Sequence, residues 1–425
     1  MKPPWPIKKL GELIEERKEK NIKKEKLPVF TVSHIYGIVP FQKVFYKRIH
    51  SIDTSNYKIV KRYDFGFGLP TKNTLPFGLL EKTEKVLISP AYTVFYIKDE
   101  KILNSKFLFY LFKTNRLKFL IIETAKSKSA TRHGLPLKFQ DLAGIQIPLP
   151  PLSIQQKIVY VLDTIQSAVE VQEKIIEKTK ELKKSMMADL FKYGGPSFRK
   201  GRKLKKTEID EIPEDWGIEK IGDLVEMKYG YRCSIPNIES SNGVYIISTA
   251  EITTDGKLNL SKLRKVEIPE HLIESYTLHK GDLLFNWRNA PEHVGKTAIL
   301  DFTPIKNYIY ASFLIRLRCN QKKIYNKFLH LILNFFKEKR KFVKLSRRAV
   351  NQANYNAEEL KELLVFLPSL EEQKEIVETI QTIDQKIEIE QKKKELYEEL
   401  FKTMLNKLMN GEIDVDLLRV SELAS

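Results

Sequence analysis

The sequence contains very little cysteine: Cys233 and Cys319 are the only two among 425 residues, and 86 positions separate them. This excludes a disulfide-stabilised scaffold and any cysteine-based zinc site, and it favours a reducing, cytoplasmic location. We expect both cysteines to be core residues. Long apolar runs are also missing, and the first ten residues, MKPPWPIKKL, lack the apolar core of a signal peptide. We therefore expect no membrane span.

Recognisable catalytic motifs are missing as well. The triplet GKT at 295–297 looks like the end of a phosphate-binding loop, but the glycine expected five residues before Gly295 is Ala290. The glycines of FGFGLP at 65–70 do not open a helix, so they do not indicate a dinucleotide fold. No Asn-Pro-Pro-aromatic stretch typical of an amino-methyltransferase occurs, and the seven histidines show no metal-ligand spacing. The sequence predicts no catalysis and no metal or cofactor in this chain.

Positive charge is abundant. The formal net charge is +19, of which residues 1–150 carry +15, and residues 316–348 alone carry +11. Basic surface on two separate parts of the chain suggests a polyanion that is contacted in two places. An anionic membrane would also attract such charge, but we find no basic amphipathic helix with an aromatic face. We therefore expect a nucleic acid partner and no membrane.

The chain repeats itself. Residues 149–162 read LPPLSIQQKIVYVL and residues 367–380 read LPSLEEQKEIVETI. Aligning 149–192 with 367–410 needs no gap and gives 16 identities in 44 positions. The similarity continues upstream in three pairs of segments: 5–15 with 216–226, 57–67 with 276–285, and 105–112 with 326–333. The chain is therefore a tandem duplication of one unit.

Each copy ends in a long amphipathic helix. In the first helix an apolar seam alternates steps of four and three and has a polar middle: Ile158, Leu162, Ile165, Val169, Gln172, Ile176, Thr179, Lys183, Met186 and Leu190. The second copy keeps the same register from Ile376 to Leu408. Such a stripe could pack on its own domain, but a 40-residue helix is about 60 Å long, more than one domain needs. We predict that the two helices pair, antiparallel about a pseudo-twofold axis.

These patterns predict an α+β protein with two pseudo-symmetric α+β DNA-recognition domains, separated by two long antiparallel helices that form a coiled coil. Short β-like runs at 86–97 and 310–318 are followed by helix-like stretches at 103–125 and 327–345. The expected segments are a first recognition domain at 1–150, a first helix at 151–194, a linker at 195–210, a second recognition domain at 211–367, a second helix at 368–410 and a tail at 411–425.

Polar loops occupy matched places in both copies. They are SKSATRHGLP at 127–136, SRRAVNQANYN at 346–356, GLPTKNTLPFG at 68–78 and NWRNAPEHVG at 286–295. Arg suits guanine and Asn or Gln suits adenine, so these loops can read base edges. Any one residue could equally be a solvated surface side chain. The candidate DNA-binding residues are Lys72, Asn73, Lys126, Lys128, Arg132, His133, Arg288, Asn289, Arg347, Arg348, Asn351, Gln352 and Asn354.

Taken in order along the chain, several segments of the sequence resemble those of the specificity (S) subunits of type I restriction–modification enzymes, and the resemblance covers nearly the whole chain. The resemblance rests on four segments: IPLPPLSIQQKIV at 147–159, FLPSLEEQKEIV at 366–377, the DFGFG…SPAYTVF stretch at 64–95 and GDLLFNWRNAPEHVGKTAI at 281–299. One departure is Ile154, where the family usually has a glutamate before the glutamine, as in Glu372-Gln373.

The resemblance implies that each globular region reads one half of a split double-stranded DNA target. The helices would set the spacing of the half-sites and dock two methyltransferase (M) subunits, which carry S-adenosylmethionine. Motor-nuclease (R) subunits using ATP and Mg would complete the complex, leaving no cofactor on this chain. A helix of about 60 Å would place half-site centres roughly one to two DNA turns apart, and unlike domains predict an asymmetric target.

Two other hypotheses remain open from the residues alone. The chain could be the DNA-reading part of a single-chain nuclease or methyltransferase. It could also be an RNA-binding or scaffold protein, whose affinity would be equal for any sequence.

Overall fold

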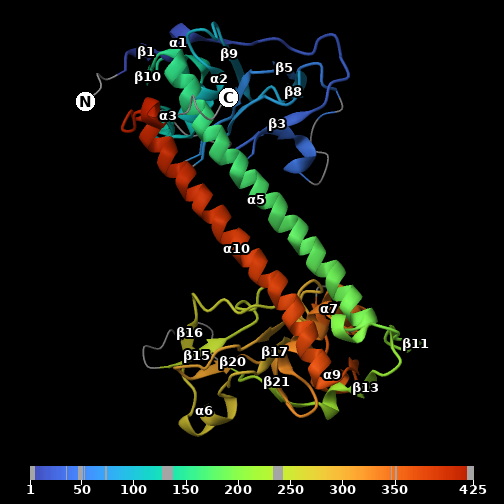
Figure 1. Ribbon diagram of the computed structural model, residues 1–425. Coiled ribbons are helices and arrows are strands. Elements are labelled where there is room, and N and C mark those ends of the chain that lie inside the picture. Colours follow the sequence, from blue (N-terminus) through green and yellow to red (C-terminus); the bar gives the residue numbers. More distant parts are fainter. Residues whose placement is uncertain are drawn as a thin grey trace. The chain divides into compact units, whose positions relative to one another are not determined.

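The computed structural model describes residues 5–34, 36–45, 51, 53–71, 74–126, 137–232, 243–345, 347–349 and 352–418. The chain divides into two compact units: unit 1 is Met1–Lys174 with Gln391–Ser425, and unit 2 is Ile175–Glu390. Each unit contains one globular region and parts of two long helices (Figure 1). Helices and strands are mixed in both units, so the expected α+β class is confirmed.

Unit 1 is built around a four-stranded antiparallel sheet in the order β2-β9-β6-β7. Its elements are β1 (Ile7–Lys9), α1 (Leu10–Leu13), β2 (Ile14–Glu16), β3 (Phe30–Ser33), β4 (Gly37–Pro40), η1 (Phe41–Lys43), β5 (Lys58–Lys61), β6 (Phe65–Phe67), β7 (Phe77–Leu79), β8 (Lys85–Ile88), β9 (Thr93–Ile97), α2 (Ser105–Lys113), α3 (Asn115–Lys126), α4 (Phe139–Ala143), β10 (Gln146–Pro148) and η4 (Val415–Leu418). The rings of Phe65 and Phe95 stack at 4.9 Å between centroids at its centre.

Unit 2 repeats this sheet in the order β14-β21-β17-β19, again antiparallel throughout. Its elements are η2 (Pro196–Phe198), β11 (Leu204–Lys206), β12 (Glu211–Pro213), β13 (Gly217–Lys220), η3 (Ile221–Asp223), β14 (Val225–Tyr229), β15 (Val244–Ile247), β16 (Arg264–Val266), α6 (Glu270–Tyr276), β17 (Leu283–Asn286), β18 (Arg288–Asn289), β19 (Thr297–Ile299), β20 (Tyr308–Tyr310), β21 (Leu314–Cys319), α7 (Asn326–Glu338), α8 (Lys341–Leu345), β22 (Arg347–Ala349), β23 (Gln352–Asn354), α9 (Ala357–Lys361) and β24 (Leu364–Leu367). The matched strand order agrees with the duplication.

The two long helices are α5 (Leu152–Tyr193) and α10 (Leu370–Met409). In unit 1 the start of α5 shares a core with the end of α10, through Ile158 and Leu405 among others. In unit 2 the end of α5 shares a core with the start of α10, through Leu190 and Ile376 among others. The helices therefore run antiparallel, as Figure 1 shows for α10 beside the start of α5. The ends of the apolar seam also pack into the domain cores.

The middle of the seam is polar, as the sequence indicates. In unit 1 the Lys394 ammonium lies 2.9 Å from the Glu173 carboxylate, across the two helices. In unit 2 Lys183 donates to both oxygens of Asp384, at 2.7 and 2.8 Å. Partly buried ion pairs of this kind fix the register of two helices more than they add stability.

The repeated phrase holds one buried glutamine in each unit. The Gln155 amide accepts a hydrogen bond from the Asn104 N–H (2.8 Å) and donates to the Ile102 and Pro150 carbonyls. Gln373 makes the same set of contacts, accepting from the Tyr325 N–H (2.7 Å) and donating to the Lys323 and Pro368 carbonyls. In both units the glutamine therefore joins the long helix to the start of a domain helix, α2 or α7.

The segment predicted as a linker is folded. Strands β11 and β12 form an antiparallel hairpin, and Trp216 just beyond them is buried. The buried Glu372 carboxylate accepts from the Arg202 guanidinium, the Gly195 N–H (3.0 Å) and the Trp216 indole N–H (3.0 Å). The sequence does not reveal this because the partners of Glu372 are more than 150 residues away in the chain. In unit 1, apolar Ile154 packs against the core at the matching position.

Two predicted helical stretches are each broken in two. The stretch at 103–125 becomes α2 and α3, separated at Thr114, whose hydroxyl donates to the Leu111 carbonyl at 2.7 Å. The stretch at 327–345 becomes α7 and α8, separated where Arg340 takes a positive φ of 57°. A continuous helical pattern does not show such breaks, because they depend on local caps rather than on periodicity.

Candidate nucleic-acid interface

A small sheet in unit 2 brings together two of the predicted reading loops. Strand β18 pairs with β23, placing Arg288 opposite Asn354 and Asn289 opposite Ala353. Strand β23 also pairs with β22, placing Arg347 opposite Asn354. The segments 286–295 and 346–356 were predicted as loops; parts of both form one antiparallel sheet, β18-β23-β22. Candidate residues from two distant segments therefore lie on one surface.

Arg288 rests on an aromatic platform. Its guanidinium lies 5.4 Å from the centroid of the Phe313 ring, within cation–π range. The neighbouring Trp287 ring meets Phe313 and Tyr229 edge to face, at 6.4 and 5.3 Å, and its indole N–H donates to the Ser312 carbonyl at 2.8 Å. Phe313 is 47% exposed and Tyr229 is 41% exposed. The contacts with Trp287 thus hold the Phe313 and Tyr229 rings in place, and both rings stay partly exposed to solvent.

Two asparagines of this surface behave differently. The Asn289 side chain accepts a hydrogen bond from the Ala290 N–H at 2.8 Å, so its oxygen supports the local turn. The side-chain oxygen of Asn354 is buried and has no hydrogen-bond partner among the described residues. A buried acceptor without a partner is costly. The Asn354 oxygen is therefore not open to solvent in this structure, whereas Arg288 is partly exposed.

The GKT triplet plays a structural role. The Lys296 ammonium is buried and donates to the carbonyls of Thr249 (3.2 Å) and Ile252 (2.6 Å), and burial lowers the pKa of this lysine. Gly295 has a φ of +84°, and an added Cβ would lie 2.2 Å from a ring carbon of Phe342. These contacts explain why glycine and lysine occur here without a phosphate-binding loop.

The candidate residues of unit 1 are mostly outside the described residues. Lys126 ends α3, and its ammonium pairs with Glu123 on the same helix at 2.7 Å. For Arg347, Arg348 and Gln352 only the backbone, in strands β22 and β23, is described. The candidates that lie wholly outside the described residues are Lys72, Asn73, Lys128, Arg132, His133 and Asn351. Their roles stay predictions.

Sequence reasoning missed Phe313 and Tyr229. Tyr229 ends β14 and Phe313 lies in the turn before β21. Only the tertiary structure shows that both rings contact Trp287 and that Phe313 lies under Arg288. Both cysteines were expected in the core. Cys319 is half-buried against the core of unit 2, and burial raises the pKa of its thiol to about 12. Cys233 lies outside the described residues.

Within the described ranges, no cluster of three or more His, Cys, Asp or Glu side chains is arranged to hold a metal ion. No helix in the described part of the chain combines the length and apolar character that a membrane crossing requires.

Comparison with known families gives one consistent match. The family model described as "Type I restriction modification DNA specificity domain" matches twice, at residues 3–181 and 213–399. The two matches cover most of the chain and correspond to the two copies of the duplication.

Relatives in two organisms carry the same kind of name. A stretch of 212 residues, half of this chain, is 37% identical to a Methanocaldococcus jannaschii protein named for the MjaX specificity subunit of a type I restriction enzyme, and the chain spans about half (49%) of that relative's length. The MjaVIII specificity subunit of the same organism is 29% identical over 75% of this chain and 72% of the relative. The EcoKI specificity subunit of Escherichia coli is 24% identical over 68% of this chain and 60% of the relative.

Solved structures support the fold. A chain from a study of complex assembly and conformational transition of the type I R-M system aligns with a TM-score of 0.59 at 17% identity, covering 97% of this chain and 99% of that one. The S subunit of a type I restriction-modification system from M. genitalium aligns with a TM-score of 0.54 at 14% identity, covering 95% of this chain and 96% of that one. At this identity the likeness shows the fold alone.

Proposed function

The chain belongs to the type I restriction modification DNA specificity family and is a specificity subunit, and from this premise we propose that its two units read two different half-sites of one DNA target. Specificity subunits are the non-catalytic, DNA-recognising members of type I systems. The proposal extends this to a bipartite, asymmetric target in double-stranded DNA, with one half-site for each unit.

The observation that carries the proposal is the β18-β23-β22 sheet of unit 2. It places Arg288 opposite Asn354 in the sheet, with the Arg288 guanidinium over the ring of Phe313. Arg and Asn are the side chains that pair in a bidentate way with guanine and adenine edges. This sheet is therefore our candidate base-reading element of unit 2.

Asymmetry of the target is supported by the difference between the two copies. The four-stranded sheets match in strand order, whereas the loops that follow the domain helices, 127–136 and 346–356, differ in sequence. A shared scaffold with different loops would present different side chains to each half-site. A palindromic target would instead require two equivalent reading surfaces.

Spacing and partner docking are assigned to the long helices. Beyond the seam, both helices carry large apolar side chains that are more than 40% exposed: Val171 and Leu182 on α5, and Ile389, Leu396 and Leu400 on α10. Leu396 and Leu400 of α10 both belong to unit 1 and are four residues apart, which places them on one helix face. We assign this part of α10 to the docking of methyltransferase subunits. The double substitution Leu396→Glu with Leu400→Glu should abolish co-purification of the methyltransferase subunit with this chain. If the double variant still co-purifies with the methyltransferase, the docking assignment is wrong.

The remaining parts of the proposal concern chemistry and location. We assign S-adenosylmethionine to the methyltransferase subunits, ATP and Mg to motor-nuclease subunits, and no cofactor to this chain. The complex would act on DNA in the cytoplasm. Incubating the purified chain alone with S-adenosylmethionine and DNA should give no methylation. Methyl transfer by the pure chain would contradict this assignment and support the hypothesis of a single-chain enzyme.

The test of the reading function is selection of bound sequences from a random duplex library, with the chain bound to its methyltransferase partner and competitor DNA at moderate salt. Two unlike short motifs at a fixed spacing are expected. Salt-sensitive binding without any motif would contradict the proposal and favour a basic scaffold, since non-specific binding depends on phosphate contacts alone.

A further inference from the structure

A second small sheet of unit 2 carries no assigned role. Strand β15 lies in its middle, antiparallel to β16 and parallel to β20. Tyr245 in β15 is directly opposite Lys265 in β16 and Tyr308 in β20, so these three side chains share one face of the sheet. Lys306 lies in the bend before β20, and its ammonium reaches the same face, where it lies over the Tyr245 ring.

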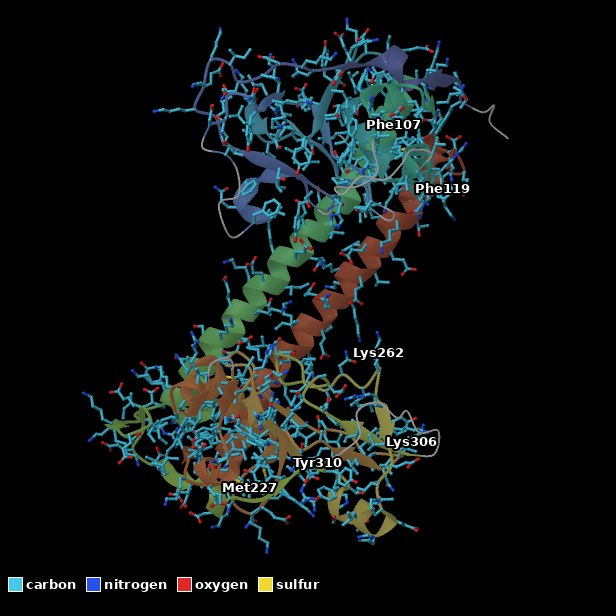
Figure 2. All side chains as sticks on the ribbon, turned by 180° about the vertical axis from the view of Figure 1, so that it is seen from behind. Phe107, Phe119, Met227, Lys262, Lys306 and Tyr310 are labelled. Carbon is cyan, nitrogen blue, oxygen red and sulfur yellow. The ribbon has the colours of Figure 1, made fainter. Side chains whose placement is uncertain are left out.

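Positive charge is concentrated on this sheet. Lys262, Arg264 and Lys306 are exposed, and Lys265 is half-buried. The ammonium groups of Lys265 and Lys306 lie 5.3 and 5.2 Å from the centroid of the same ring, that of Tyr245. Figure 2 shows Lys262 and Lys306 on the same side of unit 2, with Tyr310 further inside. We call Lys262, Lys265 and Lys306 with Tyr245 and Tyr308 the basic sheet surface; Arg264, which pairs with Ile246, belongs to the opposite face of the sheet.

Bringing like charges together costs free energy in the isolated protein. The segment 262–266, KLRKV, contains three cationic side chains and no acidic one. The ammonium groups of Lys265 and Lys306 both lie over the ring of Tyr245, which limits their motion and keeps them near the sheet. An arrangement of this kind is suited to a polyanion whose charges are regularly spaced, because each ammonium can meet one phosphate.

The basic sheet surface is anchored to the candidate base-reading element of the same unit. Ile309 and Tyr310 of β20 are fully buried, and the Ala311 N–H donates to the Ile247 carbonyl of β15 at 2.9 Å. The chain then continues directly to Ser312, whose carbonyl accepts from the Trp287 indole, and to Phe313, which supports Arg288. A short, hydrogen-bonded segment therefore connects the basic sheet surface to the platform under Arg288.

We propose that the basic sheet surface binds the phosphate backbone of the duplex DNA that unit 2 reads, without reading sequence itself. This rests on the proposed function and adds a second contact to it. Lysine ammonium groups act as point charges toward phosphates, and tyrosine hydroxyls donate to phosphate oxygens. Such contacts fix the position of the protein on the duplex, while base contacts from the β18-β23-β22 sheet would supply the sequence preference.

The test is the salt dependence of DNA binding by two matched variants, each in complex with the methyltransferase partner. The first replaces the basic residues of the surface: Lys262→Gln, Lys265→Gln and Lys306→Gln. The control removes three positive charges from exposed sites elsewhere in unit 2: Lys200→Gln, Lys203→Gln and Lys220→Gln. Thermal unfolding of both variants checks that the fold is retained.

For the surface variant we expect a lower slope of log K against log salt. Each lost phosphate contact reduces the slope by about 0.9, so loss of all three contacts would reduce it by roughly 2 to 3. Affinity should fall at least about tenfold for every sequence, with the selected motif unchanged. The control variant should keep the slope of the wild type to within about 1.

Three outcomes would overturn the inference. An unchanged slope in the surface variant would show that these residues do not meet phosphates. Equal reductions of the slope in both variants would show that the effect comes from the lower net charge and not from this surface. A changed motif would show that the surface reads bases. If the wild type selects no motif at all, the proposed function fails, but the difference in slope between the two variants still decides whether this surface binds the backbone.

Discussion

Phe313 lies in the turn before β21 and Arg288 lies in β18, yet the Arg288 guanidinium lies only 5.4 Å from the centroid of the Phe313 ring. The Phe313 ring restricts the motion of the long Arg288 side chain, and Trp287 contacts the Phe313 ring edge to face. An arginine that is already oriented loses less conformational entropy when it binds a base edge. At the residue scale, Phe313 is therefore expected to determine specificity by positioning Arg288.

Phe313→Ala should weaken binding to the selected target by roughly three- to tenfold, the value of one cation–π contact, and should leave competitor DNA binding unchanged. Combined with Arg288→Ala, it should add little, because both changes remove the same contact. The measurement is a competition titration with target and shuffled duplexes. Phe119→Ala, at an exposed phenylalanine (65%) of unit 1, is the control. Additive losses would contradict the positioning role.

We expect the partly buried His330 on α7 to make the free energy of unfolding depend on pH. Burial lowers the pKa of His330 below 6.5, and its Nε2–H donates to the Gly256 carbonyl at 2.9 Å. The unfolded chain binds a proton at His330 more readily than the folded chain does. The free energy of unfolding is therefore highest above the unfolded pKa of about 6.5, and it falls as the pH drops toward the pKa of the folded state. Urea unfolding of the wild type should therefore weaken from pH 7.5 to 5.5, and His330→Gln should weaken less.

The exposed His271 provides the matched control, since His271→Gln should keep the pH dependence of the wild type. If His330→Gln and the wild type lose equal stability over this range, the buried neutral state of His330 is not the cause.

At the scale of elements, the buried glutamines explain why the sequence repeats its phrase. Each amide makes three hydrogen bonds to backbone groups, so truncation leaves buried donors and acceptors without partners. Gln155→Ala and Gln373→Ala should each lower the free energy of unfolding by about 2 to 4 kcal/mol. Gln156→Ala changes the exposed neighbour and should cost under about 0.5 kcal/mol. Chemical denaturation compares them, and equal losses for Gln155 and Gln156 would disprove the anchoring role.

The long helices could be predicted nearly to the residue, at 151–194 and 368–410 against Leu152–Tyr193 and Leu370–Met409. Their periodic seam runs without interruption between proline at the start and glycine at the end, so local signals suffice. The hairpin of β11 and β12 could not be predicted in this way. It is held by Glu372, which is distant in sequence, and sequence patterns do not report such contacts.

For the whole molecule, the sequence revealed the duplication, the α+β class and the family resemblance, because all three depend on order and similarity along the chain. It also named loops that contain Arg288 and Asn354. It could not show that β18 and β23 pair, nor that Phe313 supports Arg288, because both depend on tertiary pairing. Residues in the corresponding loops of unit 1 stay predictions.

The central claim is that one chain reads two half-sites at a distance set by its helices. The most direct measurement is the affinity of the chain, in complex with its methyltransferase partner, for targets in which single base pairs are inserted or deleted between the two selected motifs. A rigid spacing predicts one optimum, with affinity falling by at least about tenfold within two base pairs, since each half-site then rotates out of register. Equal affinity across all spacer lengths would contradict the claim.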